Sequence, residues 1–230
     1  APAERVIVPA EKKFGFVAVA AGDGLKNLFT DLGVDVVVQG GQTMNPSTDE
    51  IVRAVDAVPA ETVFVLPNNK NIIMAAEQAV HLSGEKKIVV VATKTIPQGI
   101  SAMLAVDPDS EDGDAIAQAM RDAAHHVRSG QVTYAARDSE FDGKKIKEGE
   151  YLSLFEGKLC ASGRESSVLK KLVREMVTDE SAFATVVYGE GVTEEQAAEV
   201  EALLHRENKD MEISVIDGGQ PVYYYILSVE

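Results

Sequence analysis

The most chemically distinctive segment of this chain spans residues 40–50 and reads GGQTMNPSTDE. It follows a short apolar run and joins two glycines to several uncharged hydrogen-bonding side chains. Ser47 stands three residues before Glu50, which is the spacing of a capping box at the start of a helix. Such a turn brings polar groups and free backbone N–H groups to a helix N-terminus, where it suits a carboxylate, a phosphate or a partner's backbone. The alternative is a connection that only caps its helix.

Two later loops have similar side chains. Apolar runs also end at residues 67–71 (PNNKN) and at residues 93–99 (TKTIPQG). We expect these two loops and the loop at residues 39–47 to follow adjacent parallel strands, at the sheet edge where ligands bind in open α/β folds. Lys70 and Lys94 are the obvious counter-charges for an anion, although both also fit ordinary surface lysines at helix starts. The loops contain no candidate acid–base pair, so they predict a binding surface more than a reaction centre.

Several chemistries are disfavoured by missing motifs. Residues 22–24 read GDG after an apolar run, but Asn27 replaces the third glycine of a dinucleotide fingerprint and Gln42 replaces its acidic residue. The chain has no P-loop motif and no G-x-S-x-G motif. Adjacent His125 and His126 would point to different sides of a helix, so no metal site is predicted. Nothing specific supports a Ser-His-Asp triad, although the sequence alone leaves one open.

Composition limits which classes of function and location remain. The chain has 230 residues and a formal net charge of −15, which argues against nonspecific nucleic-acid binding and against an anionic membrane surface. Cys160 is the only cysteine, which excludes an internal disulfide and a thiolate metal cluster. There is no apolar run of about 18 residues and no signal-peptide core, so we expect a cytoplasmic protein without a membrane span. We also expect the chain to be a piece of a longer protein, with residues 1–13 as a linker remnant.

Periodicity predicts two domains. The first, residues 14–128, alternates strands with amphipathic helices and so predicts a parallel α/β sheet with right-handed crossovers. The second, residues 129–230, carries hairpin turn signals at residues 142–143 and 156–157 and then a strand–helix–strand unit, which predicts an α+β domain. The expected strands are residues 14–20, 34–38, 62–66, 88–92, 132–136, 151–155, 158–161, 183–188, 211–216 and 222–229, and the expected helices are residues 25–32, 51–58, 72–82, 115–127, 166–177 and 193–204.

Five runs, in order, carry a resemblance to a known family. They read GGQTMNPSTDEIV, LPNNKNIIMAAEQA, ATKTIPQGISAM, SGQVTYAARD and GGQPVYYYILSVE. Over residues 14–230 the chain resembles the C-terminal region of the A component of bacterial fatty acid kinase, whose family is also labelled DAK-phosphatase-like or dihydroxyacetone-kinase-like. The resemblance implies a kinase domain that binds ATP and Mg²⁺, a middle domain, and this C-terminal region, which docks a separate DegV-like fatty-acid-binding protein. The kinase then phosphorylates the bound fatty acid for phospholipid synthesis.

The resemblance also implies which chemistry this chain lacks. It has none of the kinase's phosphate-binding or metal-binding motifs, so we expect a noncatalytic module without a cofactor, whose ATP and Mg²⁺ belong to the kinase domain. Its two-domain layout is similar to that of the DegV-like carrier itself. Those carriers place a His and an Arg near the lipid carboxylate; here Gln220 stands where the His is expected, and Arg137 is the arginine to consider.

Three functions stay open from the sequence. The chain is either a docking module or a sensing domain with an acyl chain or anion in its interdomain cleft. The phosphatase label of the family suggests a hydrolase as a third possibility. The loop at residues 218–221 is expected to close over the cleft or to be a tight strand connection. The sequence does not determine whether the chain forms a homodimer, which face docks the partner or which acyl chain is preferred. The candidate ligand- or partner-binding residues are Gly40, Gly41, Gln42, Thr43, Asn45, Ser47, Asn68, Asn69, Lys70, Lys94, Thr95, Gln98, Arg137, Gly219 and Gln220.

Overall fold

The computed structural model describes residues 5–41, 44–141 and 143–230. The chain forms two compact units, Ala1–His126 and Val127–Glu230. The first contains a parallel sheet and the second a mixed sheet, which confirms the predicted α/β class. Within the described residues, no helix has the length and apolar character needed to cross a membrane.

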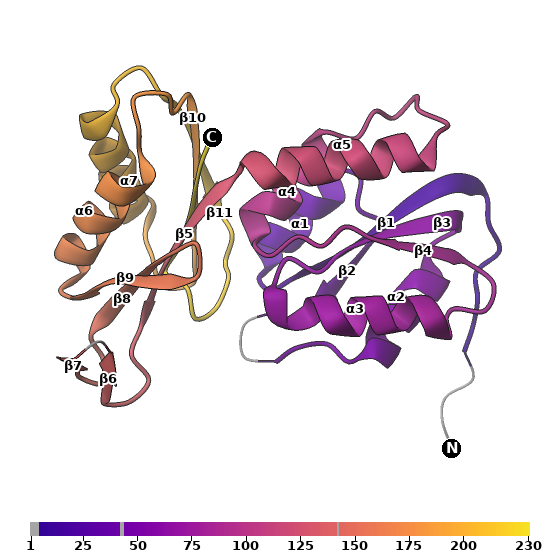
Figure 1. Cartoon of the computed structure of the whole chain (residues 1–230), viewed down its shortest axis with the longest axis horizontal. Coiled ribbons are helices and arrows are strands. Elements are labelled where there is room, and N and C mark those ends of the chain that lie inside the picture. Colours follow the sequence, from indigo (N-terminus) through magenta and orange to yellow (C-terminus); the bar gives the residue numbers. More distant parts are fainter. Residues whose placement is uncertain (1–4, 42–43, 142) are drawn as a thin grey trace. The chain divides into compact units, whose positions relative to one another are not determined.

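The first unit is a four-stranded sheet in the order β2-β1-β3-β4, with every pair parallel. Helices α2 and α3 cover one face and α1, α4 and α5 cover the other (Figure 1). Its elements are β1 (Lys12–Ala20), α1 (Asp23–Asp31), β2 (Val36–Gln39), α2 (Thr48–Ala57), β3 (Ala60–Leu66), α3 (Lys70–Leu82), β4 (Lys87–Val90), α4 (Ile96–Leu104) and α5 (Gly113–His126).

Alternating side chains of the central strands build a core on each face of this sheet. Val17 and Val65 pack with Ile51 and Ile72 in a buried cluster beneath α2 and α3. On the opposite face the rings of Phe16 and Phe64 stack with centroids 5.4 Å apart. Because both faces are covered, β1 has no polar side chain after Lys13 and β3 has none after Thr62, as in other buried parallel sheets.

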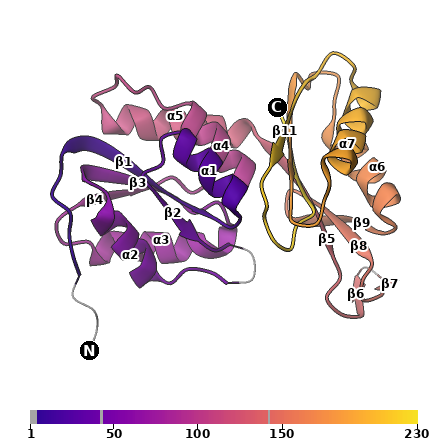
Figure 2. The same ribbon diagram turned by 180° about the vertical axis from the view of Figure 1, so that it is seen from behind.

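The second unit has a six-stranded sheet in the order β11-β10-β12-β5-β8-β9, with β6 and β7 as a separate hairpin. Helices α6 and α7 lie on one face of the large sheet (Figure 2). A Cβ atom on Gly130 would overlap Sδ of Met176, so this glycine lets α6 approach β5. The elements are β5 (Arg128–Tyr134), β6 (Ser139–Phe141), β7 (Lys144–Ile146), β8 (Tyr151–Phe155), β9 (Lys158–Gly163), α6 (Glu165–Met176), β10 (Phe183–Tyr188), α7 (Glu194–Glu207), β11 (Glu212–Asp217) and β12 (Tyr225–Val229).

Two expectations about the first unit were wrong. Residues 96–99 belong to helix α4 and not to a loop. Pro97 favours a loop when only its neighbours are considered, but proline also fits the first turn of a helix, and Thr95 caps this one. In addition, β1 lies between β2 and β3, so the three polar loops do not follow three adjacent strands. Strand order depends on contacts between distant segments, which local periodicity does not record.

Both ends of the chain also differ from expectation. Strand β1 begins at Lys12, inside the expected linker remnant. The preceding residues attach to the first unit, since Nε of Arg5 lies 2.8 Å from a carboxylate oxygen of the buried Asp56. The last strand starts at Tyr225 and not at residue 222, because Val222 has a φ of 71°, which extended backbone does not allow.

The capping box at the start of α2 generates a prediction about stability. Oγ of Ser47 accepts a hydrogen bond from the Glu50 N–H at 3.2 Å, and the Glu50 carboxylate accepts one from the Ser47 N–H at 2.7 Å. We expect Ser47→Ala to lower the free energy of unfolding by about 1 kcal/mol. Urea unfolding at neutral pH measures this change. No measurable loss would show that the cap does not contribute.

The same contact predicts a pH dependence. The two hydrogen bonds from Ser47 lower the pKa of Glu50 in the folded chain. Its contribution is therefore present above the unfolded pKa and is lost as the pH falls through the lower folded pKa. We expect Glu50→Gln to lose less stability than the wild type between neutral pH and about pH 3. Glu77→Gln, an exposed carboxylate on α3, is the matched control and should follow the wild type.

Candidate functional site

Asn68 joins the carboxyl ends of three strands of the first unit. It follows β3 and is only 6% exposed. Its N–H donates to Oγ1 of Thr93 after β4 at 3.0 Å, its Oδ1 accepts from the same hydroxyl at 2.8 Å, and its Nδ2 donates to the Val19 carbonyl of β1 at 3.0 Å. Its φ of 55° is one that asparagine tolerates better than most residues. Asn68, expected as a binding residue, therefore supports the loops from beneath.

The loop after β4 is fixed by contacts of the same kind. Oγ1 of Thr95 accepts from the Gln98 N–H at 3.2 Å, and Oε1 of Gln98 accepts from the Lys94 N–H at 2.8 Å. A Cβ atom on Gly99 would overlap Oδ1 of Asn68, so α4 reaches the end of β3 only because this residue is glycine. The side chains of Thr95 and Gln98 thus hold the start of α4, while the Lys94 side chain is exposed.

The first two polar loops meet although their strands are not adjacent. Nδ2 of Asn69 donates to the Gly41 carbonyl at 2.6 Å. Gly40 and Gly41 both have positive φ, 152° and 98°, and the Gly41 N–H donates to the Met44 carbonyl at 3.0 Å. A Cβ atom on Gly40 would lie 2.9 Å from that same carbonyl oxygen. The glycines are therefore required by the turn, and Asn69 ties it to the start of α3.

Two exposed methionines lie on the segments that Asn69 joins. Met44 is 78% exposed in the first loop, and Met74 is 69% exposed on α3. Lys70 is also exposed and stands one helical turn before Met74, so the two share one side of α3. With the exposed Asn45, we call these four residues the methionine rim. The predicted residues Gln42 and Thr43 lie outside the described part of the chain.

The methionines are not identified by sequence reasoning. Only the exposure of their side chains identifies them, and a sequence does not give exposure. The one feature of the sequence that could have indicated Met44 is its place beside a glycine turn, since unbranched, polarisable methionine recurs at adaptable binding surfaces.

The third loop contributes to a different feature. Thr93, Lys94 and Gln98 line a pocket of about 250 Å³ together with Arg121 and His125 of α5, and we call it the basic pocket. From the sequence, α5 is an ordinary surface helix. The sequence feature that could have indicated this pocket is the spacing of Arg121 and His125, since residues four apart share a helix face.

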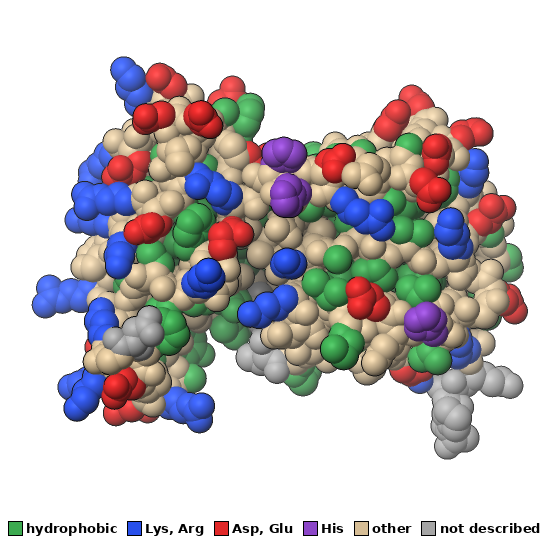
Figure 3. All heavy atoms as spheres, viewed as in Figure 1, with side chains coloured by type: hydrophobic (Ala, Val, Ile, Leu, Met, Phe, Trp, Pro, Cys, Tyr) green, Lys and Arg blue, Asp and Glu red, His purple; other side chains and the backbone are tan. Residues whose placement is uncertain are grey.

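The basic pocket adjoins the open edge of the sheet. Strand β4 is an edge strand, and Figure 3 shows apolar side chains gathered over it, between α3 and α5. Nη2 of Arg121 donates to the Val90 carbonyl of this strand at 3.3 Å. Covering an edge carbonyl is one way in which proteins limit unwanted strand pairing.

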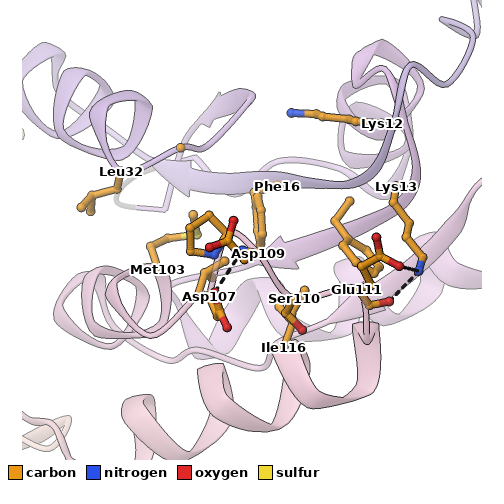
Figure 4. A pocket seen from close by; sticks show the side chains of 14 residues that line it. Lys12, Lys13, Phe16, Leu32, Met103, Asp107, Asp109, Ser110, Glu111 and Ile116 are labelled. Atoms are coloured by element: carbon orange, nitrogen blue, oxygen red, sulfur yellow. Dashed lines mark hydrogen bonds and ion pairs between the residues drawn. The ribbon is translucent and has the colours of Figure 1, made fainter.

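A larger pocket lies at the opposite, amino end of β1. It encloses about 680 Å³ and has an apolar base that includes Phe16 and Met103 (Figure 4). Its charged rim is paired internally: Nζ of Lys13 donates to the Glu111 carbonyl at 2.6 Å, and Lys12 pairs with Asp35. Three carboxylates, those of Asp107, Asp109 and Glu111, also line the pocket, so it does not favour an anion.

The candidate residues of the second unit lie in two of its loops. Gln220 is fully buried, and its Nε2 donates to the carbonyls of Val187 and Tyr223 at 3.2 and 3.3 Å. Its amide thus holds its own loop, in which Gly219 has a φ of 60°. Arg137 is exposed between β5 and β6. That these residues meet the loops of the first unit stays a prediction.

The remaining reactive groups of the described residues include acidic, imidazole and thiol side chains. No group of three or more His, Cys, Asp or Glu side chains in those ranges is placed to hold a metal ion. Cys160 is partly buried, and this burial raises the pKa of its thiol, which disfavours the nucleophilic thiolate. The geometry offers hydrogen-bonded strand ends that present the methionine rim and the basic pocket.

Known proteins with the same fold were found by structural comparison. A DegV family protein, Cg2579 from Corynebacterium glutamicum, matches with a TM-score of 0.66 and 15% identity, covering 94% of this chain and 96% of that chain. The fatty acid kinase (Fak) B3 protein of Streptococcus pneumoniae, loaded with linoleic acid, matches with a TM-score of 0.60 and 10% identity, covering 95% and 99%. At these identities the likeness shows a shared DegV-like fold.

Sequence comparison shows the family. Protein YloV of Bacillus subtilis is 44% identical over 230 residues, which are all of this chain and 41% of YloV. The chain therefore spans less than half the length of this relative. The model of the FakA-like C-terminal family, named for the A component of fatty acid kinase, matches residues 15–230. This range includes both units and confirms the resemblance drawn from the five sequence runs, so the chain belongs to the FakA-like C-terminal family.

Proposed function

We propose that this chain is the noncatalytic C-terminal module of a fatty acid kinase and that it docks a DegV-like fatty-acid-binding protein. Its family supports the link to a fatty acid kinase. The Fak B3 protein, which carries linoleic acid, is an example of the partner class. The kinase domain, with its ATP and Mg²⁺, and the middle domain would lie in the part of relatives such as YloV that this chain does not span.

The methionine rim is the observation that carries the docking proposal. Met44 and Met74 expose most of their side chains, so a partner that covers them removes apolar area from water. Covering one methionine side chain contributes about 1.5–3 kcal/mol. Lys70 adds a positive charge on the same side of α3 and so favours an acidic partner surface beside the apolar contact.

The hydrogen bonds beneath the rim make it a preorganised surface. Asn69 fixes the first loop against α3, and Asn68 fixes the ends of β1, β3 and β4. A surface that is ordered before binding loses less conformational entropy when the partner docks. The rim therefore suits a protein partner better than an isolated exposed methionine on a free loop would.

We expect Met74→Asp to weaken docking by roughly tenfold or more, because it replaces an apolar contact by a charge that would have to be desolvated. Calorimetric titration with a lipid-loaded DegV-like carrier from the same host measures the Kd. Leu104→Asp is the matched control, since Leu104 is 67% exposed at the far end of α4. The control should bind like the wild type.

Two results would count against this site. Equal weakening by both variants would point to a general effect of added negative charge. Saturable binding that Met74→Asp leaves unchanged would place docking on another face. The absence of saturable binding by the wild type would instead contradict the docking function itself, or require the missing domains.

The noncatalytic role has its own test. Incubating the chain with ATP, Mg²⁺ and a loaded carrier should give no acyl phosphate, because the kinase domain is expected to supply the nucleotide site. Trapping acyl phosphate with hydroxylamine measures the product. Turnover above the blank without the chain would overturn the noncatalytic assignment.

The shared fold favours one alternative, a sensing domain that holds its own acyl chain or anion. The chain and the linoleate-loaded Fak B3 protein superpose over 95% and 99% of their lengths. Native mass spectrometry of the purified chain separates the two functions. A stoichiometric copurified lipid would favour the sensing domain, and a bare polypeptide mass would favour the docking module.

A further inference from the structure

The basic pocket differs in charge from four other pockets of this acidic chain. Four other pockets formed by described residues each include at least one carboxylate: Glu111 in two of them, Glu165 in the third and Glu207 in the fourth. The basic pocket has none among its lining residues, although the chain carries a net charge of −15. It has two cations, Lys94 and Arg121, and an imidazole that becomes a third when protonated.

One hydrogen bond holds Arg121 in place and leaves its other N–H donors available. Its Nη2 donates one N–H to the Val90 carbonyl at 3.3 Å, and a guanidinium has five N–H donors in total. His125 lies one helical turn further along α5 and lines the same pocket. Arginine matches carboxylate and phosphate oxygens with paired donors, so the anchored guanidinium is a preorganised anion-binding group.

The opposite wall comes from the start of α4. The Lys94 backbone is fixed by its hydrogen bond to Gln98, while its side chain is exposed beside the pocket. Helix α4 begins at Ile96, so its positive end adds to the favourable potential for an anion. The Thr93 hydroxyl donates to Oδ1 of Asn68, so Thr93 forms part of the pocket wall and is not expected to bind the ligand. Lysine, arginine and imidazole therefore approach one small volume from two elements.

We propose that the basic pocket binds a phosphoryl dianion. A phosphoryl group offers three oxygens and two charges to donors that come from two sides, whereas a carboxylate offers two oxygens and one charge. The volume of about 250 Å³ is below the usual range for drug-sized ligands, so it suits a phosphoryl group with a small organic part. The ligand is inorganic phosphate or a small phosphate monoester, and the site goes beyond the docking function because it needs no carrier.

Titration of the ¹⁵N-labelled chain tests this site, with inorganic phosphate, glycerol phosphate and acetate as probes at constant ionic strength. We expect saturable amide shifts in residues 93–98 and 121–125 for the two phosphates and weaker binding of acetate. Tighter binding of glycerol phosphate would assign the site to a monoester, and equal binding would assign it to the phosphoryl group alone. Acetate binding as tight as phosphate would overturn the phosphoryl class.

Variants link the shifts to the proposed residues. Arg121→Gln should raise the Kd for phosphate by roughly tenfold or more, since it removes charge-assisted hydrogen bonds. Lys94→Gln should raise it less, and it should leave the fold intact because its side chain is exposed. Lys26→Gln, which removes an exposed lysine from α1, is the matched control and should bind phosphate like the wild type.

Two outcomes would overturn the assignment. Phosphate binding that neither Arg121→Gln nor Lys94→Gln weakens would place the anion elsewhere, and no saturable shift up to millimolar phosphate would remove the site. Far-ultraviolet circular dichroism of each variant shows that the fold is intact. Because no carrier is present in the titration, a failure here is distinct from a failure of docking, which the calorimetry measures separately.

Discussion

The hydrogen bonds of Asn68 are the constraint on which the candidate surfaces depend. One buried side chain reaches the Val19 carbonyl of β1 and the Thr93 hydroxyl after β4, from its own place after β3. The strands themselves are held by their ladders, but the loops beyond them have no ladder. A buried amide with satisfied donors and acceptors supplies that missing order, and leaving such groups unpaired would be costly. Gly99 completes the arrangement by admitting Asn68 against α4.

Both proposed surfaces follow from this arrangement. Asn69, the next residue, caps α3 and holds the glycine turn, so Met44 and Met74 are presented on a fixed frame. Thr93 leads directly into Lys94, whose backbone is held by Gln98. Polar residues near the strand ends thus divide into two roles. Those with buried or engaged side chains support the loops, and those with exposed side chains remain available for ligands or partners.

Local patterns predicted most elements, because capping boxes and strand alternation depend on neighbouring residues. The capping box predicted at Ser47 is present, and β10 spans the residues expected for it. The site was harder to predict, since exposure and strand order depend on distant contacts. Asn68 was expected to contact a ligand, but its side chain is buried. Pro97 led to the prediction of a loop where α4 begins. Arg121 lies near Lys94 only because of the way α5 packs.

The shared fold does not by itself transfer a ligand to this chain. Proteins of the same fold can keep the framework while the site residues change, so function has to be argued from the site. In the second unit, Gln220 is fully buried and donates to two backbone carbonyls of its own surroundings. A side chain used in this way is not free to bind a lipid carboxylate. The exposed methionines and the carboxylate-free pocket, both in the first unit, are therefore stronger guides to what this chain recognises than its likeness to lipid carriers.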